Sequence, residues 1–138
     1  KNANNLRILI AEDNMMNKMV IERFLRNMNI TDFHIVETGI DVLDQLSKND
    51  YDLSLMDCHM PKMNGYETTK KIREQEETTK RHIPIIAITA DAMSGDREKC
   101  IACGMDDYLS KPLNIHDFNK IIARYSLLPK QEYDEKRA

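Results

Sequence analysis

Short apolar runs that stop abruptly at polar residues recur along this chain, and they constrain its fold more than any other feature. Four of these runs have the length of buried strands, at residues 6–11, 33–36, 53–56 and 83–88, and a fifth, at residues 108–109, predicts a very short strand. A segment with apolar residues at helical spacing follows each run, at about 16–25, 39–46, 66–76, 92–103 and 115–127. Strands that alternate with helices in this way predict an α/β fold, in which helices cover both faces of a five-stranded parallel sheet.

Single residues mark where several of these elements begin or end. Asn14 is a candidate cap for the helix that follows it, and Gly104 suits the left-handed conformation just past a helix end. Pro84 lies near the start of its strand, where the missing N–H costs least. Crossovers between parallel strands are right-handed, and the ligand site of such a sheet lies beyond the carboxyl ends of its strands.

The overall composition excludes several classes of protein. The 138 residues are 41% hydrophobic and 31% charged, which indicates one globular domain rather than a disordered chain. The formal net charge of −3 offers no basic face, so we expect no nucleic acid partner. No apolar stretch approaches the roughly 18 residues of a membrane span, and we expect no direct membrane contact.

The domain boundaries follow from the same pattern. We expect a polar linker at residues 1–5, the domain itself at residues 6–127, and a charged tail or linker at residues 128–138. The chain starts at Lys1 rather than Met, so we expect it to be part of a longer protein. Three cysteines, without the density of a disulfide scaffold, indicate a reducing, cytoplasmic location.

A distinctive set of polar residues stands where the strands end. Glu12 and Asp13 follow the first strand, Asp57 the third, Thr89 the fourth and Lys111 the fifth. Because the carboxyl ends of parallel strands share one edge, three carboxylates converge there. Two unit charges about 4 Å apart repel by roughly 4 kcal/mol at an effective dielectric of 20, so the cluster requires a counter-charge.

Hard oxygen ligands of this kind select Mg²⁺, which keeps several waters and takes carboxylates together with phosphate oxygens. Lys111 supplies a point charge for a phosphoryl oxygen, and the Thr89 hydroxyl supplies a hydrogen-bond donor. Phosphoryl transfer needs mostly positioning and charge neutralisation, which these groups provide. An acidic pair is usually a helix cap and a Lys-Pro pair usually a turn, but their joint placement at the strand ends favours chemistry.

The ordered set of motifs strongly resembles the receiver domain of two-component response regulators, across residues 6–127. The motifs are Glu12-Asp13, Asp57, Met60-Pro61, Gly65, Thr89-Ala90 and Lys111-Pro112. The resemblance implies a flavodoxin-like, doubly wound sheet in the strand order 2-1-3-4-5 with five helices. It also implies that Lys111-Pro112 is a cis peptide bond.

The resemblance implies a role for each matched residue. Asp57 matches the phosphoacceptor and, with Asp13, a direct ligand of the Mg²⁺ cofactor. Glu12 matches the acid that holds a metal-bound water, and His59 the position whose backbone carbonyl binds the metal. No residue is expected to bind any other cofactor.

Three further residues match positions that contact the phosphoryl group or respond to it. Thr89 and Lys111 match the pair that contacts the phosphoryl group, and Tyr108 matches the aromatic switch residue that turns inward with Thr89. The expected output is a change in the surface formed by the fourth helix, the fifth strand and the fifth helix. Ser54, in a strand that is usually wholly apolar, and Asn64, where an acid is common, depart from the family pattern.

The residues around Asp13 and Asp57 look most like receivers fused to hybrid histidine kinases. The implied phosphodonor is a phosphohistidine on a histidine kinase dimerisation domain or a histidine phosphotransfer protein. We expect the domain to be a monomer that acts in a two-component phosphorelay. In isolation it is expected to catalyse only its own phosphorylation and dephosphorylation. The domain would then be a cytoplasmic part of a hybrid kinase, and that kinase could be anchored in the membrane. The alternative to a hybrid kinase is a stand-alone response regulator.

Other functions find less support. An aspartyl-phosphate phosphatase needs a second acid two residues after the nucleophile, where this chain has His59. A flavin carrier needs a Ser/Thr/Gly-rich phosphate loop, where Glu12 and Asp13 stand instead. Cys100 and Cys103 form a C-x-x-C pair, but at a helix end, where packing is the expected role rather than redox or zinc chemistry.

Overall fold

The computed structural model describes residues 5–90, 95 and 97–126 of the chain. Its elements are β1 Ile8–Ala11, α1 Met15–Asn27, β2 Phe33–Val36, α2 Gly39–Lys48, β3 Leu53–Asp57, α3 Gly65–Thr79, β4 Ile85–Thr89, α4 Arg97–Cys103, β5 Asp107–Ser110 and α5 Ile115–Ser126. The predicted alternation of strands and helices is therefore confirmed. Residues 1–4 of the predicted linker lie outside the described residues, as do residues 92–94 and 96 of the predicted fourth helix, residue 127 and the predicted tail at 128–138.

The strands form one five-stranded sheet in the order β2-β1-β3-β4-β5, as the resemblance implied. Every neighbouring pair is parallel, and the register aligns Ala11 with Met56, Asp57 with Ile88 and Thr89 with Ser110. All strands therefore end at the same edge, and the residues that follow them meet there.

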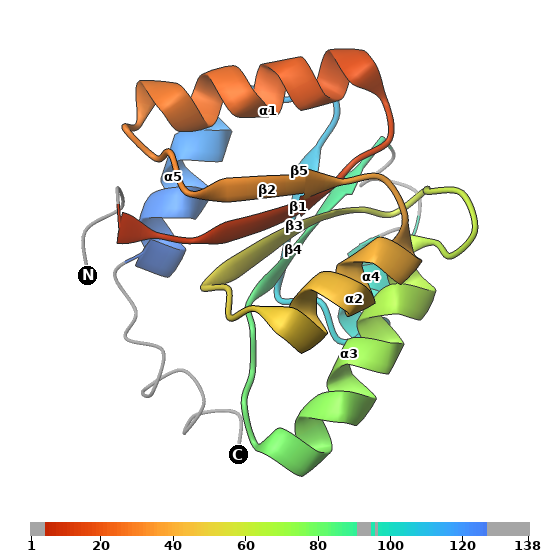
Figure 1. The fold of residues 1–138 in the computed structure, drawn as a ribbon. Coiled ribbons are helices and arrows are strands. Elements are labelled where there is room, and N and C mark those ends of the chain that lie inside the picture. The colour runs from red at the N-terminus through yellow and green to blue at the C-terminus, as the bar shows by residue number, and fades with distance from the viewer. Residues whose placement is uncertain (1–4, 91–94, 96, 127–138) are drawn as a thin grey trace.

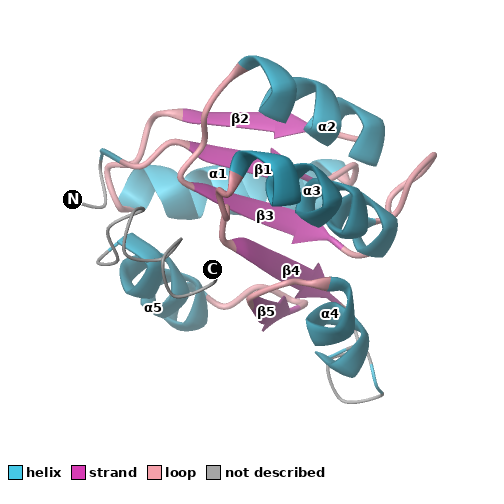
Figure 2. Ribbon diagram, turned by 90° about the horizontal axis from the view of Figure 1, so that it is seen from below, coloured by secondary structure: helices cyan, strands magenta, loops and turns pink. Residues whose placement is uncertain are grey.

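Helices cover both faces of the sheet (Figures 1 and 2), with α1 and α5 on one face and α2, α3 and α4 on the other. Successive strand residues alternate between two apolar clusters, because side chains of a strand point to opposite faces. In β1, Ile8 and Ile10 pack toward α1 and α5, whereas Leu9 and Ala11 pack toward the other three helices. Phe118, on α5, is fully buried in the first cluster.

Side chains and backbone conformations at the element ends match the sequence signals. The carboxamide oxygens of Asn14 and Asn64 accept from backbone N–H groups in the first turns of α1 and α3. Asn64, which departs from the family pattern, is thus a helix cap. Gly104 has φ of +109° just after α4, and Lys111-Pro112 is cis, as expected.

Several boundaries differ by a few residues from the predicted ones. β1 begins at Ile8 and β4 at Ile85, two residues later than the apolar runs begin. The Ile83 N–H donates to the Glu76 carboxylate on α3, at 2.7 Å, rather than to a neighbouring strand. Apolar residues just outside a strand can thus be buried without joining the sheet, since Ile83 is only 7% exposed.

Buried hydroxyl groups interrupt the core between the sheet and α3. Within the described part of the chain, the Ser54 and Thr69 hydroxyl oxygens are buried and find no hydrogen-bond partner. The neighbouring Thr68 hydroxyl is equally buried but donates to the Asn64 carbonyl oxygen at 2.8 Å. A buried hydroxyl without a partner carries an uncompensated desolvation cost.

We therefore expect Thr69→Val to raise the free energy of unfolding by about 1 kcal/mol, because valine keeps the shape and removes the unpaired hydroxyl. Thr68→Val is the matched control, and it should lower the same free energy by about 1 kcal/mol because it removes a made hydrogen bond. Urea denaturation of the three proteins measures both changes. Equal shifts in the two variants would contradict the assignment of the partners.

Candidate functional site

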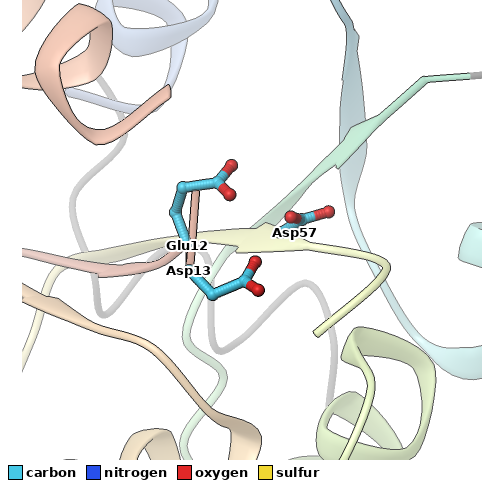
Figure 3. Close-up of side chains that lie close together, drawn as sticks. All are labelled: Glu12, Asp13 and Asp57. Atoms are coloured by element: carbon cyan, nitrogen blue, oxygen red, sulfur yellow. The ribbon is translucent and has the colours of Figure 1, made fainter. Parts of the chain in front are cut away.

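Three carboxylates meet at the carboxyl edge of the sheet (Figure 3). Each of Glu12, Asp13 and Asp57 offers an oxygen, and these oxygens all lie within 4.8 Å of one another. Glu12 and Asp13 directly follow β1, and Asp57 ends β3, so the parallel pairing of these two strands brings the groups together. Glu12 and Asp57 are buried, whereas Asp13 is exposed to solvent.

Lys111 places a positive charge between the two buried carboxylates. Its Nζ lies 3.2 Å from Asp57 Oδ2 and 3.6 Å from Glu12 Oε1. The backbone holds this lysine in place, because the Lys111 N–H donates to the Thr89 carbonyl oxygen at 2.8 Å. Three ionised carboxylates and one ammonium group leave a formal charge of −2 among these four side chains.

Glu12 is a buried carboxyl group, and burial disfavours its ionised form. Its side chain is 0% exposed, and the Asn14 N–H donates to Oε2 at 3.0 Å. Burial raises the pKa of Glu12, and the neighbouring Asp57 charge adds to that rise, while the Asn14 hydrogen bond and Lys111 oppose it. A cation bound at this edge would favour the ionised form of Glu12 in the same way as Lys111 does.

One backbone N–H and one lysine side chain hold the two oxygens of the Asp57 carboxylate. The His59 N–H donates to Oδ1 at 3.1 Å, and Oδ2 faces Lys111. Gly65, at the start of α3, packs directly on this segment, and its N–H donates to the Cys58 carbonyl oxygen at 3.0 Å. A Cβ at Gly65 would lie 2.5 Å from the Asp57 carbonyl oxygen, so only glycine allows this approach.

The donor set fits a hard divalent cation. Carboxylate oxygens at an edge with excess negative charge are the ligands that Mg²⁺ takes, with water completing its shell. Asp13 is open to solvent, which leaves room for that water. The residues present therefore fit the predicted magnesium site.

Thr89 and Tyr108 lie on the same face of the sheet, toward α4. Tyr108 pairs with Ala87 in the register of β4 and β5, and Thr89 is two residues further along β4 on the same side. Thr89 is fully buried, whereas the Tyr108 ring is half-buried and packs against the core on that side. The Arg97 guanidinium lies over the Tyr108 ring, 5.4 Å from its centroid.

The structure also reveals contributions that reading the sequence missed. The N–H groups of Asn14 and His59 orient Glu12 and Asp57, and no local sequence signal marks a backbone donor of this kind. Cys58, next to Asp57, is buried against Cys100 on α4. Its hydrogen bond with Cys100, together with burial, raises the pKa of the Cys58 thiol well above its usual range. The raised pKa disfavours the thiolate form of Cys58.

Comparison with known proteins agrees with the fold and the site. Hybrid signal transduction histidine kinase G of Dictyostelium discoideum is 44% identical over 121 residues, which are 87% of this chain and 4% of that kinase. The chain thus spans only a small fraction of the length of this curated relative.

Among the described residues, no helix has the length and apolar character needed to cross a membrane.

Two solved structures are similar in fold and sequence. The receiver domain of a sensor histidine kinase from Pseudomonas aeruginosa, solved with a magnesium ion in its active site cleft, is 41% identical with a TM-score of 0.77, over 87% of this chain and 96% of that one. The receiver domain of Saccharomyces cerevisiae Ssk1, crystallised with the histidine phosphotransfer protein Ypd1, is 30% identical with a TM-score of 0.78, over 87% and 88%. The response regulator receiver domain family matches residues 8–123, and this chain belongs to that family.

Proposed function

We propose that this domain accepts a phosphoryl group on Asp57 from a phosphohistidine, with Mg²⁺ bound at the acidic edge. The observation that carries the proposal is the convergence of Glu12, Asp13 and Asp57 within 4.8 Å, beside the Lys111 ammonium group. A buried carboxylate nucleophile, surrounded by charges that require neutralisation, is what phosphoryl transfer to an aspartate needs.

Asp13, Asp57 and the His59 backbone carbonyl would hold the metal directly, and Glu12 would hold one of its waters. The bound ion would neutralise charge on the phosphoryl oxygens and on the carboxylates around it. This role fits the exposure of Asp13 and the burial of Glu12, because a water can lie between Glu12 and the open side of the site.

The protein's own groups orient the reaction. The His59 N–H and Lys111 hold the two oxygens of Asp57, so that the carboxylate is already directed before the donor arrives. Lys111 then stabilises negative charge on the incoming phosphoryl group, and the Thr89 hydroxyl donates to another of its oxygens. Little covalent work remains for the protein beyond this positioning.

Phosphorylation would be read out through Thr89 and Tyr108. A hydrogen bond from Thr89 to the phosphoryl group would draw the Thr89 side chain toward Asp57, and the half-buried Tyr108 ring would turn into the space left behind. Both rotamers must lie within a few kcal/mol for such a switch to operate. The output would therefore be a change in the surface formed by α4, β5 and α5.

The partner would be a histidine phosphotransfer protein or the dimerisation domain of a histidine kinase. The similar Ssk1 receiver was crystallised with a phosphotransfer protein, and the similar Dictyostelium protein is a hybrid kinase. The parent of this domain would thus be a hybrid kinase, in the reducing cytoplasm that its three thiols suit. In isolation the domain would catalyse only its own phosphorylation and dephosphorylation.

The competing functions lose support at the same residues. A phosphatase would need an acid at His59, whose side chain is exposed and whose backbone N–H serves Asp57. A flavin phosphate would meet Glu12 and Asp13, whose negative charges repel it. A stand-alone response regulator would use the same site and differs only in the rest of the parent chain.

The metal site is tested by Asp13→Asn, which removes one of three repelling charges without changing the side chain's shape. Without metal, the variant should be as stable as the wild type or more stable, because repulsion falls. Added Mg²⁺ should raise the melting temperature of the wild type and of the exposed control Glu74→Gln, but not of Asp13→Asn. An equal response to Mg²⁺ in Asp13→Asn would place the metal elsewhere.

The phosphoacceptor is tested with acetyl phosphate and Mg²⁺. The wild type should gain the mass of one phosphoryl group, labile in acid and in base, and Asp57→Asn should gain none because the amide is no nucleophile. Intact-mass spectrometry measures both, with Asp52→Asn as a control that should label fully. Stoichiometric labelling of Asp57→Asn would exclude this assignment.

The coupling is tested by Thr89→Ala, which removes the hydroxyl but leaves Asp57 in place. The variant should still accept a phosphoryl group, yet the Tyr108 resonances should no longer shift on phosphorylation. NMR spectra of the free and phosphorylated proteins compare the two. A Tyr108 shift as large as that of the wild type would rule out the coupling.

A further inference from the structure

The three cysteines of the chain gather between the end of β3 and α4. Cys58 and Cys100 are 42 positions apart in the sequence, yet their Sγ atoms lie 3.8 Å apart. Cys103 Sγ instead donates to the Cys100 carbonyl oxygen at 3.2 Å, within its own helix. All three are buried thiols.

The C-x-x-C pattern therefore does not describe the thiol pair that the fold makes. Cys103 uses its thiol on a helix carbonyl, while the sulfur atoms of Cys100 and Cys58 are in direct contact. Neither member of that contact takes part in the proposed phosphoryl transfer. Packing explains why small apolar residues occupy positions 58 and 100, but two thiol sulfur atoms in contact can also be oxidised to a disulfide bond.

A disulfide bond between these residues needs only a small movement. Its sulfur atoms are about 2.05 Å apart, so the two thiols must approach by about 1.8 Å. Cys58 is fixed, because its N–H donates to the Ile88 carbonyl oxygen at 3.1 Å and its carbonyl accepts from Gly65 at 3.0 Å. The approach must therefore come from side-chain rotation and from α4, which is a helix of seven residues.

A small oxidant can reach this pair from one side. Cys100 lines a cavity of about 100 Å³ between α4 and β5, together with Arg97, Met105 and Tyr108. Cys58 is fully buried and is not among the residues that line this cavity. Molecules the size of water or hydrogen peroxide fit such a cavity, so Cys100 is the thiol that reacts with the peroxide first.

We propose that Cys58 and Cys100 form a reversible disulfide bond when the domain meets a peroxide. The Cys100 sulfur attacks one peroxide oxygen, the O–O bond breaks, and one water leaves with the thiol proton, which makes Cys100 a sulfenic acid. The Cys58 sulfur then attacks the Cys100 sulfur, the S–O bond breaks, and a second water leaves with the second thiol proton. Two thiols lose two electrons, and the peroxide is reduced to two waters; a dithiol reductant restores both thiols.

The bond would join the residue directly after Asp57 to the middle of α4. It would hold α4 against the end of β3 and close the space beside Tyr108. This consequence rests on the proposed function, because it matters only if α4 moves on phosphorylation. Oxidation would then leave Asp57 able to accept a phosphoryl group while suppressing the readout.

The bond itself is tested without phosphorylation. The reduced, folded chain is incubated with hydrogen peroxide over a range of times, since buried thiols react slowly, and remaining thiols are alkylated. We expect a product that has lost the mass of two hydrogen atoms, with one alkylated cysteine, and a Cys58–Cys100 link in peptide maps. Cys103→Ala should form the same link with no cysteine left to alkylate, whereas Cys58→Ala and Cys100→Ala should form no such link.

The wild-type map decides the proposal even where a variant folds poorly. A Cys100–Cys103 link, addition of oxygen without a crosslink, or three unmodified thiols after long exposure would each overturn it. A Cys58–Cys100 link that also forms at the same rate in the urea-unfolded chain would overturn the role of the fold.

The consequence is tested by hydrogen exchange of α4 before and after treatment with acetyl phosphate and Mg²⁺. The reduced domain should change its exchange in α4 on phosphorylation, and the oxidised domain should label at Asp57 without that change. Equal changes in both would overturn the restraint. Failure of both forms to label would instead refute the proposed function and leave the mapped disulfide standing.

Discussion

Three carboxylates that repel one another lie together at one edge of this sheet, and the positions of the surrounding elements depend on keeping them there. Oxygens of Glu12, Asp13 and Asp57 lie within 4.8 Å of one another, and Lys111 approaches the two buried ones at 3.6 and 3.2 Å. At an effective dielectric of 20, each pair of charges about 4 Å apart repels by roughly 4 kcal/mol. The single ammonium group of Lys111 does not neutralise the three carboxylates, so this edge of the folded domain favours the binding of a cation, which in turn would favour a phosphoryl group.

Backbone geometry supplies what side chains cannot in this crowded space. The N–H groups of Asn14 and His59 hold the carboxylates of Glu12 and Asp57, and they take less room than a further side chain would. Gly65 lets α3 begin against the Asp57 carbonyl oxygen, where any Cβ would lie 2.5 Å from it. Because β3, β4 and β5 pair in parallel, Thr89 and Lys111 lie at the same edge of the sheet as Asp57. Precision at the site thus comes from the sheet and the helix starts rather than from mobile side chains.

Contacts at the two ends of α4 connect the region around the site with the protein surface. Arg73 on α3 ties down the turn after α4, since its Nε donates to the Gly104 carbonyl oxygen at 2.9 Å and its Nη2 to Asp106 at 2.8 Å. The other end of α4 carries Arg97 over the Tyr108 ring, a contact worth about 0.5–1 kcal/mol at an exposed site. Among the described residues, Arg73 thus holds the turn after α4, and Arg97 connects the first turn of α4 with Tyr108 on β5. The contact of Cys100 with Cys58 lies between these two ends.

The sequence by itself determined the order of elements, the sheet and the identity of the acidic edge, because apolar periodicity and the residues that end each strand are local properties. β2 agrees with its apolar run residue for residue, and the Asn14 cap and Gly104 stand where local rules place them. Only the tertiary structure decided which backbone N–H groups hold Glu12 and Asp57, where β1 and β4 begin, and that the Cys100 sulfur lies against the Cys58 sulfur. Those features depend on distances between segments far apart in the chain, and such distances exist only once the strands have paired and the helices have packed.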